Sequence, residues 1–349
     1  MGKKLKIAVD IMGGDYAPDE IVKGALQAAR ESDVDIVLVG TKPVLETSVK
    51  TFSNAGIPVQ EVEATEMIKD GEEPAFAVMR KPNSSVALAA RLVKSGDADA
   101  MVSAGSTGAC MVAALTQIGA LPGIERPMVG GAFLGLAPKT ITLDLGANVG
   151  CQPYHLVDFA VAGTVYARTF MDIDNPTVGL LNVGAEEGKG NPQAKEAFGL
   201  LKNSGLNFIG NVEGNDIPAG KANVIVCDGF VGNILVKFCE SLGKGVSIWL
   251  ANELKGSMGK TDLDRVTSRL YGLMSPGVAM GGGPMWGVDG VVGIAHGSSR
   301  AHQIAGTIKQ VKIAVENGFV DQLKTELKKV QDKRAQGKSE EVRNRSKRR

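Results

Sequence analysis

The stretch KIAVDIMGGD, residues 6–15, joins a run of apolar residues to two glycines and an acid. The same order, an apolar run and then glycine with a small polar residue, recurs before several helix-like stretches. It is found in AMVSAGSTGA (100–109), ITLDLGANVG (141–150), GLLNVGAEEGKGN (179–191), VIVCDGFVGN (224–233) and VVGIAHGSS (291–299). Strands that alternate with helices predict an α/β fold, a three-layer sandwich in which helices cover both faces of a mostly parallel sheet.

Helical patterns fill the segments between these strands, over residues 18–30, 84–94, 107–118, 153–169 and 191–202. Apolar stripes over 238–255 and 261–274, joined by a short turn, predict a protruding helical hairpin at about 238–274. We expect a single α/β domain over residues 1–323 that includes this hairpin. Residues 324–349 carry eleven Lys or Arg against four Asp or Glu and few apolar residues, which predicts a frayed helix or a flexible basic tail.

The composition argues against several classes of protein. The formal net charge of +1 does not suit a dedicated nucleic-acid binder, and no apolar run reaches the ~20 residues that a membrane span requires. Residues 1–4 run straight into a strand pattern, so we expect no signal peptide. The cysteines are scattered without a CxxC pair, which favours buried thiols in a cytoplasmic protein over a zinc site or a disulfide framework. They are Cys110, Cys151, Cys227 and Cys239.

The familiar cofactor and catalytic motifs are missing from the sequence. Neither GxGxxG nor the P-loop pattern GxxxxGK[ST] occurs, and GxSxG is absent too. With three histidines in the chain, a Ser-His-acid triad is not indicated. Asp144 and Asp228 each end a strand, and capping of the following loop is a simpler interpretation than metal ligation. We therefore expect neither a cofactor nor a metal.

The strand-end loops are the remaining candidates for a binding site. Glycine lets main-chain N–H groups approach an anion closely, and a following helix adds partial positive charge. For any one loop a tight turn is the simpler interpretation, whereas several such loops at one sheet edge favour a phosphate site in a single cleft. The candidate phosphate ligands are Gly13, Gly14, Asp15, Ser103, Gly105, Ser106, Thr107, Gly108, Asn148, Asn191, Asp228 and Gly232.

Three side chains are the candidate catalytic groups. Lys189 stands between two glycines where a strand ends, so it can bring a point charge to a phosphate that loop amides hold. The alternative is a solvated lysine paired with Glu186 or Glu187. Asn233 can donate or accept through its amide, or it is a turn residue. His296 ends the last strand, where a structural histidine and an active-site histidine are equally consistent with the pattern.

Eight segments, in order, resemble the bacterial phosphate acyltransferases of phospholipid synthesis. They are VDIMGGDYAPDEIVKGA (9–25), SAGSTGA (103–109), ERP (125–127), LDLGANV (143–149), GLLNVGAEEGKGN (179–191), FIGNVEGNDI (208–217), VCDGFVGNILVK (226–237) and GVDGVVGIAHGSS (287–299). The resemblance implies conversion of fatty acyl-acyl carrier protein and inorganic phosphate into acyl phosphate. It also implies a fold related to phosphotransacetylases and to the isocitrate/isopropylmalate dehydrogenases. Ser106, Gly150 and Gln152 depart from the family pattern, which has Asn, Asp and Lys there.

The resemblance further implies a cytoplasmic homodimer that associates peripherally with the inner face of the membrane and needs no metal or nucleotide. Acyl carrier protein and phosphate would be its partners, with a downstream membrane glycerol-phosphate acyltransferase as a further one, and no nucleic acid. Leu254 and Met258, flanked by Lys255 and Lys260, would form an interfacial tip on the hairpin. The alternatives are a phosphotransacetylase that uses coenzyme A, a metal- and NAD-dependent dehydrogenase of the same fold, and a non-catalytic module.

Overall fold

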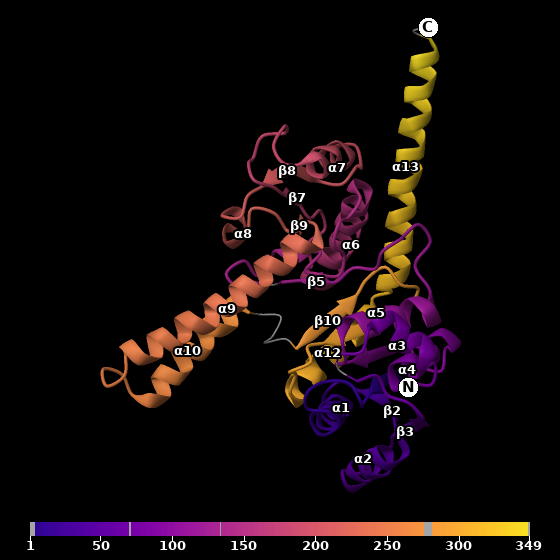
Figure 1. Cartoon of the computed structure of the whole chain (residues 1–349), viewed down its shortest axis with the longest axis vertical. Coiled ribbons are helices and arrows are strands. Elements are labelled where there is room, and N and C mark those ends of the chain that lie inside the picture. The colour runs from indigo at the N-terminus through magenta and orange to yellow at the C-terminus, as the bar shows by residue number, and fades with distance from the viewer. Residues whose placement is uncertain (1–3, 70, 133, 276–280, 348–349) are drawn as a thin grey trace. The chain divides into compact units, whose positions relative to one another are not determined.

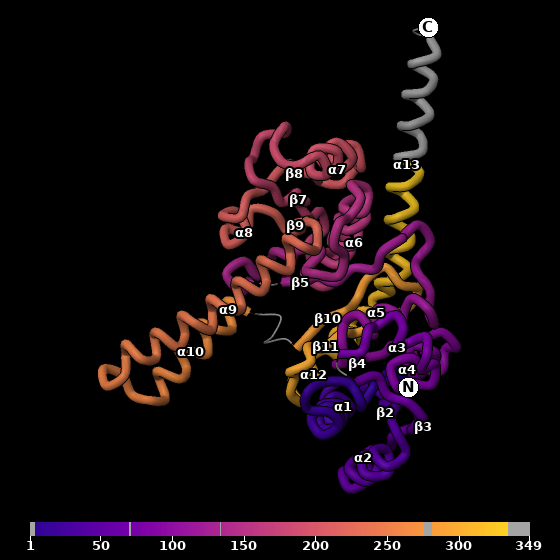
Figure 2. The backbone as a smooth tube through the Cα atoms, viewed as in Figure 1, coloured from indigo at the N-terminus to yellow at the C-terminus, as the bar shows by residue number. Residues whose placement is uncertain are grey.

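The computed structural model describes residues 4–69, 71–132, 134–275 and 281–347, with side chains described as far as residue 333. Figure 1 shows the elements of the chain, and Figure 2 traces the same backbone as a tube. The chain divides into two compact units, unit 1 (Met1–Leu121 and Gly277–Val320) and unit 2 (Pro122–Pro276 and Asp321–Arg349). The expected domain over residues 1–323 therefore contains two sheets instead of one, and its action as one catalytic domain stays a prediction.

The described part of unit 1 contains one sheet with the strand order β10-β11-β4-β1-β2-β3. Its strands are β1 (Leu5–Asp10), β2 (Val34–Gly40), β3 (Gln60–Glu63), β4 (Ala100–Ser103), β10 (Gly282–Met285) and β11 (Val291–Ala295). All neighbours pair in parallel except β10 and β11, which are antiparallel. Every residue of β4 and β11 is buried, so both faces of the sheet are covered, as the apolar runs predicted.

The helices of unit 1 follow the predicted apolar spacing closely. In α1, the residues Ile21, Val22, Ala25 and Ala28 are buried on one side, while Asp19 and Glu20 occupy the first turn. The pattern over 107–118 forms α5 and continues without a break as one turn of π-helix, η1. The helices are α1 (Asp19–Glu31), α2 (Lys42–Asn54), α3 (Pro74–Arg80), α4 (Ser85–Ser95), α5 (Thr107–Ala113), η1 (Ala114–Ile118) and α12 (Ala301–Glu316).

In the described part of unit 2 the strands form a second sheet with the order β5-β6-β9-β7-β8. Its strands are β5 (Gly130–Gly131), β6 (Ile141–Leu143), β7 (Val178–Leu181), β8 (Phe208–Val212) and β9 (Val224–Val226). Only the edge pair β5–β6 is antiparallel among them. The helices are α6 (Pro153–Met171), α7 (Pro192–Lys202), α8 (Asp216–Ala219), α9 (Gly229–Glu253), α10 (Lys260–Met274) and most of α13 (Phe319–Lys347).

The predicted helical hairpin is confirmed, with an earlier start. Helices α9 and α10 lie side by side and are joined by a short turn (Figure 1). Helix α9 begins at Gly229 because the Asp228 side chain caps it, accepting from the Phe230 amide at 2.9 Å. No residue of α10 is buried, and α9 buries Gly229, Gly232, Gly243 and Ser247, so the large apolar side chains of the hairpin are exposed or half-buried. No helix within the described residues is both long enough and apolar enough to cross a bilayer.

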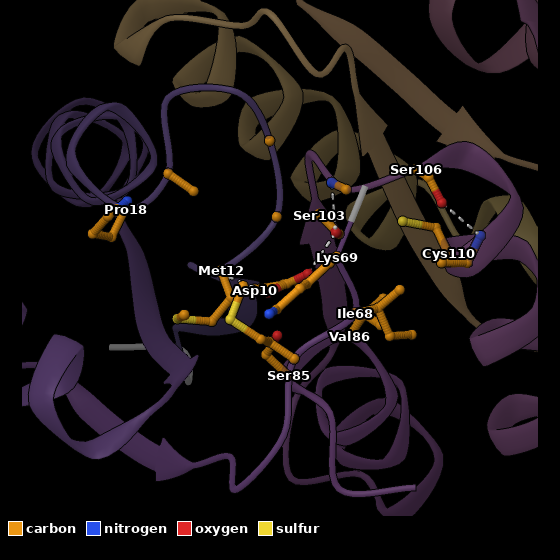
Figure 3. Close-up of a pocket in the computed structure, with 16 residues that line it drawn as sticks. Asp10, Met12, Pro18, Ile68, Lys69, Ser85, Val86, Ser103, Ser106 and Cys110 are labelled. Atoms are coloured by element: carbon orange, nitrogen blue, oxygen red, sulfur yellow. Dashed lines mark hydrogen bonds between the residues drawn. The ribbon is translucent and has the colours of Figure 1, made fainter. Parts of the chain in front are cut away.

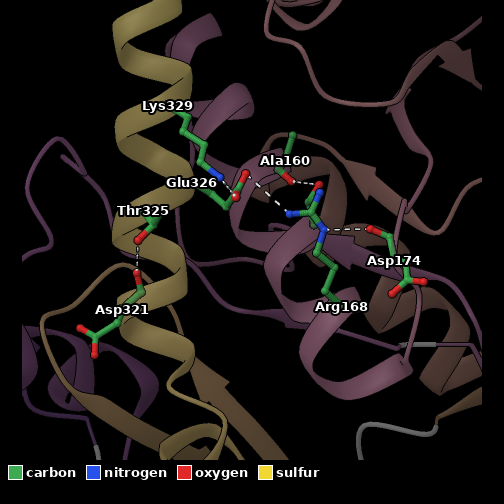
Figure 4. Close-up of polar contacts among 8 residues, drawn as sticks. Ala160, Arg168, Asp174, Asp321, Thr325, Glu326 and Lys329 are labelled. Atoms are coloured by element: carbon green, nitrogen blue, oxygen red, sulfur yellow. Dashed lines mark hydrogen bonds and ion pairs between the residues drawn. The ribbon is translucent and has the colours of Figure 1, made fainter.

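The basic tail begins as part of the fold. Helix α13 runs without a break through the boundary expected between residues 323 and 324. Leu323, Leu327 and Val330 recur at helical spacing and are buried, which ties this part of the tail to unit 2. Glu326 forms ion pairs with Arg168 of α6 at 3.6 Å and with Lys329 at 2.7 Å (Figure 4). The segment that its charge predicted to be a flexible tail therefore includes residues that pack in unit 2.

Candidate functional site

Three loops of unit 1 meet at the carboxyl edge of its sheet. They follow β1, β4 and β11, which are neighbours in the strand order. The Asp15 amide donates to the Gly297 carbonyl at 2.9 Å. A Cβ atom on Gly14 would lie 3.2 Å from the carbonyl oxygens of both Ala104 and Gly297. These loops and the first turn of α5 hold the predicted ligands Gly13, Gly14, Asp15, Ser103, Gly105, Ser106, Thr107 and Gly108 and the predicted catalytic His296.

A buried hydrogen-bond network joins two of these loops. Asp10 ends β1 directly beside Ser103, its register partner at the end of β4. The Ser103 hydroxyl donates to the Asp10 carboxylate at 2.7 Å and accepts from the Gly105 amide at 3.1 Å (Figure 3). A Cβ atom on Gly13 would lie 2.6 Å from the Gly105 nitrogen, so the two loops touch through their backbones. Ser103 is itself buried, and its contribution here is to fix the Gly105 amide.

Asp10 was not among the sequence-predicted residues. Burial raises the pKa of its carboxyl group, and hydrogen bonds from Ser85, Ser103 and the Met12 amide oppose that shift. The sequence signal for Asp10 was its position at a strand end, the same position that drew attention to Asp144 and Asp228. A carboxylate with this many donors around it holds the loop geometry.

A cavity of about 260 Å³ lies beside this network in unit 1. Figure 3 shows Asp10, Met12 and Lys69 around it, with Ser106 and Cys110 on the side of α5. Lys69 was missed by the sequence reasoning because it follows no glycine-bearing strand. Lys69 and the Gly14 backbone are the groups of this lining that suit a small anion, because the Gly13 and Gly105 amides already donate to Asp10 and Ser103.

Ser106 and its neighbours form the start of α5. The Ser106 hydroxyl caps this helix by accepting from the Ala109 amide at 3.2 Å. Thr107 and Gly108 lie in the first turn of the helix and not in the loop before it. Gly108 also packs closely, since a Cβ atom there would lie 2.7 Å from a ring carbon of Pro74. The hydroxyl of Ser106 therefore has a local structural role.

The His296 side chain is exposed at the end of β11. Its Nδ1 atom lies 2.8 Å from the Ser298 hydroxyl, within the same turn. The residue is thus anchored locally while its ring remains accessible. Both sequence interpretations of His296 remain compatible with this arrangement.

Unit 2 has an analogous set of loops at the carboxyl edge of its own sheet. They follow β6, β9 and β7, which are again neighbours. The Gly229 amide, at the start of α9, donates to the Asn148 carbonyl in the β6 loop at 2.9 Å. A Cβ atom on Gly146 would lie 3.1 Å from Cβ of Asn233. These loops and the first turns of α9 hold the predicted residues Asn148, Lys189, Asn191, Asp228, Gly232 and Asn233.

Asn148 is buried and its amide group is engaged within the loop. Its Nδ2 atom donates to Asp144 at 2.7 Å and to the Pro127 carbonyl at 2.8 Å. Asp144 also accepts from the Gly146 and Ala147 amides. Burial raises the pKa of Asp144 to about 6, although these donors oppose the shift. The capping role expected for Asp144 is confirmed, and Asn148 belongs to the same structural network.

Asp228 is confirmed as a capping residue. One carboxylate oxygen caps α9, and the other accepts from the Cys151 amide at 2.7 Å. Burial acts to raise the pKa of Asp228, but the Cys151 and Phe230 amides and Gln193 outweigh it and hold the pKa below its usual range. Asp228 is therefore ionised near neutrality, and hydrogen bonds from neutral amides stabilise its charge.

Gly232 and Asn233 lie inside α9 and not in a loop. A Cβ atom on Gly232 would overlap the Asp144 carbonyl oxygen and lie 3.1 Å from Cα of Leu145. Glycine at this position lets the helix start press against the β6 loop. The Asn233 side chain is exposed one residue further on, beside the turn at Gly146.

Lys189 is exposed in the loop after β7. Its aliphatic stem lies along Gly184, where a Cβ atom would be 3.0 Å from Cγ of Lys189. Within the described residues its amine forms no ion pair, and Glu187 pairs instead with Lys202 at 3.0 Å. The alternative of a lysine paired with a neighbouring glutamate is therefore not seen. Asn191 caps α7 by accepting from the Ala194 amide at 2.8 Å.

The predicted residues thus occupy two sheet edges, one in each unit. The expectation that all of these loops follow strands of one sheet is wrong, because the strands pair in two separate sets. Across the residues that the structure describes, no group of three or more His, Cys, Asp or Glu side chains is placed to hold a metal ion.

Comparison with known proteins identifies relatives over nearly the full chain. A sequence model of the family described as "Fatty acid synthesis protein" matches residues 5–322. A phosphate acyltransferase of Thermosynechococcus vestitus is 46% identical over 321 residues, 90% of this chain and 93% of that protein. One from Pelotomaculum thermopropionicum is 44% identical over 336 residues, covering 95% and 98%.

A solved phosphotransacetylase from Streptococcus pyogenes has a TM-score of 0.62 to this structure at 19% identity, covering 90% of this chain and 95% of that one. At this identity the likeness concerns the fold alone, and it confirms the expected relation to phosphotransacetylases. The sequence matches, which extend through both units at more than 40% identity, decide the family: this chain belongs to the phosphate acyltransferases.

Proposed function

We propose that this protein transfers a fatty acyl group from acyl carrier protein to inorganic phosphate and thereby supplies acyl phosphate for glycerol-phosphate acylation in phospholipid synthesis. The observation that carries this proposal is the match to relatives named phosphate acyltransferase over at least 90% of the chain. The description of the matching family as a fatty acid synthesis protein supports a fatty acyl substrate.

The chemistry needs few specialised groups. A phosphate oxygen attacks the thioester carbonyl carbon, a C–O bond forms, and the C–S bond breaks as the thiolate leaves. Phosphate is already an anion at neutral pH, so no general base is needed to create the nucleophile. The thiol of the leaving group has a pKa near ~8.5, by analogy with cysteine, so it departs without obligatory protonation. Catalysis then consists of binding phosphate, aligning it and stabilising the oxyanion.

We assign these tasks to the candidate residues as follows. In unit 1 the Gly14 amide binds a phosphate oxygen, since glycine exposes its backbone to a ligand, while the Gly13 and Gly105 amides donate to Asp10 and Ser103 and fix the loops around it. In unit 2 Lys189 stabilises negative charge, and the proposal is supported by its amine, which is exposed and forms no ion pair with the residues that the structure describes. Asn233 donates a hydrogen bond from the start of α9. His296, Asp15, Thr107 and Asn191 complete the proposed set.

The test is an assay with purified protein, palmitoyl-acyl carrier protein and phosphate, in which hydroxylamine traps the acyl phosphate. We expect product with phosphate alone, undiminished by EDTA and without added NAD. Strict dependence on a divalent metal or on NAD would contradict the proposal. Parallel reactions with palmitoyl-coenzyme A and acetyl-coenzyme A distinguish the phosphotransacetylase alternative, which predicts that a coenzyme A thioester is the better substrate.

We also propose a homodimer in which α9 contributes to the interface. The side chains of Phe230, Ile234, Phe238 and Trp249 recur along this helix, and each is more than half exposed in the single chain. A continuous apolar stripe of this kind is typical of a protein–protein interface. Light scattering at micromolar concentration should give about twice 36.4 kDa.

A matched pair of variants tests where the dimer forms. Phe238→Glu should shift the mass toward the monomer, because a buried unpaired charge at an interface is costly. Lys237→Glu, one residue away on the exposed helix surface, should remain dimeric. A monomeric wild-type protein, or a dimer that Phe238→Glu leaves intact, would argue against α9 as the interface.

Membrane association is proposed for the tip of the hairpin. Met258 is exposed in the turn between α9 and α10, next to Lys255 and Lys260, a combination that suits the surface of an anionic bilayer. Basic residues near such a surface contribute roughly 1 kcal/mol each, and less as salt screens them. The acyl phosphate product is both apolar and reactive, so its release at a bilayer would limit hydrolysis.

Flotation with anionic vesicles tests the tip. We expect salt-sensitive binding that Met258→Glu weakens, whereas Thr47→Glu on α2 of unit 1, which adds the same charge, should not. A chain shortened after residue 333 keeps the buried Leu327 and Val330 and tests the tail separately. If the shortened chain fails to bind and Met258→Glu binds normally, the tail is the membrane anchor and the tip is not.

A further inference from the structure

We propose that a cleft in unit 2, between β7, α7 and the start of α9, holds the fatty acyl chain of the substrate and that Val231 helps to set the chain length accepted. This inference rests on the proposed acyltransferase function. The cleft has a volume of about 450 Å³, which lies in the range of small-molecule sites. Its apolar wall comes from four segments of unit 2 and contains Leu156, Leu181, Val183, Val231 and Leu235.

The wall exposes apolar side chains that the unit does not cover. Val183 is 81% exposed and Val231 is 42% exposed, although both line a concave surface. Leu156, which also lines the cleft, is buried. Exposed apolar surface in a concave site gains free energy when an apolar ligand displaces water from it. A hydrocarbon chain fits this wall better than a polar ligand does.

The polar groups at the rim do not oppose an apolar occupant. Asn191 Oδ1 already accepts from the Ala194 amide, and both oxygens of Asp228 accept from main-chain amides. A hydrocarbon chain beside these three oxygens would therefore leave none of them without a partner, the main penalty when polar groups are desolvated.

The residues at the rim suggest how the acyl chain is oriented in the cleft. Gly190 and Asn191 line the cleft and directly follow Lys189, the proposed catalytic lysine. The cleft opens at the carboxyl ends of β7 and β9, where ligands bind in open α/β sheets. A chain in the cleft would thus have its thioester carbonyl at the rim, near Lys189, and its methyl end toward Leu156. The depth of the cleft would then limit the length of the acyl chain that the protein accepts.

The test measures chain-length selectivity in Val231→Trp. The larger side chain shortens the cleft, and each methylene excluded from apolar contact costs about fourfold in affinity. We expect the ratio of kcat/KM for palmitoyl- over octanoyl-acyl carrier protein to fall at least ~10-fold, since two or more methylenes lose their contacts. Ile248→Trp is the matched control, because Ile248 is an exposed aliphatic residue of the same helix that does not line the cleft. It should leave the ratio unchanged.

A second measurement separates failure of the cleft assignment from failure of the proposed acyltransferase function. An equal loss for both chain lengths in Val231→Trp would mean that the cleft takes another part of the substrate, such as the pantetheine arm, and would overturn the proposal. Equilibrium binding of labelled palmitate, without phosphate, is independent of turnover. If the wild type lacks acyltransferase activity but binds palmitate, and Val231→Trp weakens that binding, the proposed function fails and the cleft assignment stands. An unchanged selectivity ratio or unchanged palmitate binding would overturn the assignment.

Discussion

Replacing Lys189 by alanine should lower kcat/KM for phosphate-dependent acyl transfer by ~10²-fold or more, the scale seen when one preorganised oxyanion donor is removed. The physical reason is the isolation of the Lys189 amine in the loop after β7, where its charge is available for a ligand because Glu187 pairs with Lys202 instead. Folding should be unaffected, since the Lys189 side chain is exposed. Steady-state kinetics and a urea unfolding curve measure the two effects separately.

Lys195→Ala is the matched control for this experiment. Lys195 carries the same charge and is exposed on α7, and its replacement leaves the Glu187–Lys202 ion pair intact. Its loss should change kcat/KM by less than ~3-fold, because an exposed charge outside the strand-end loop contributes little. Wild-type kinetics in Lys189→Ala, or equal losses in both variants, would show that Lys189 is an ordinary solvated charge.

Gly232→Ala should both destabilise unit 2 and impair catalysis. The added methyl group would overlap the backbone carbonyl of Asp144, which cannot rotate away as a side chain can. Overpacking of this kind costs about 1–3 kcal/mol, or more where backbone must move. The displaced helix start would carry Asn233 away from the turn at Gly146, so activity should fall as well. Urea denaturation at fixed temperature gives the loss of stability, and the hydroxylamine assay gives the loss of activity.

Gly245→Ala in the same helix provides the comparison. A Cβ atom on Gly245 would meet nothing within 4 Å, so only helix propensity changes. We expect a gain in stability of up to ~1 kcal/mol, because alanine favours the helix over glycine. If Gly232→Ala is as stable and active as Gly245→Ala, then the contact between the start of α9 and the β6 loop has no functional importance.

The sequence by itself determined the local elements and the family. Apolar runs that end in glycine predicted where β1, β4, β7 and β9 end, and apolar stripes predicted α9 and α10, because these features depend on residues close in the chain. The ordered segments from residue 9 to residue 299 indicated the phosphate acyltransferases, and relatives more than 40% identical confirm that family. The prediction for the tail was less accurate, because its overall charge obscured the helical spacing of the buried Leu327 and Val330.

Only the tertiary structure decided which strands share a sheet and which polar groups find partners. The alternation of strands and helices is similar in both units, so nothing local revealed that the loops lie at two sheet edges. The sequence suggested Asn148 and Ser103 as ligands. In the structure the Asn148 amide donates to Asp144, and the Ser103 hydroxyl donates to Asp10, which lies 93 residues away in the chain. Strand pairing and side-chain partners are set by contacts between distant residues, whereas turns and helices are set by the conformational preferences of near neighbours.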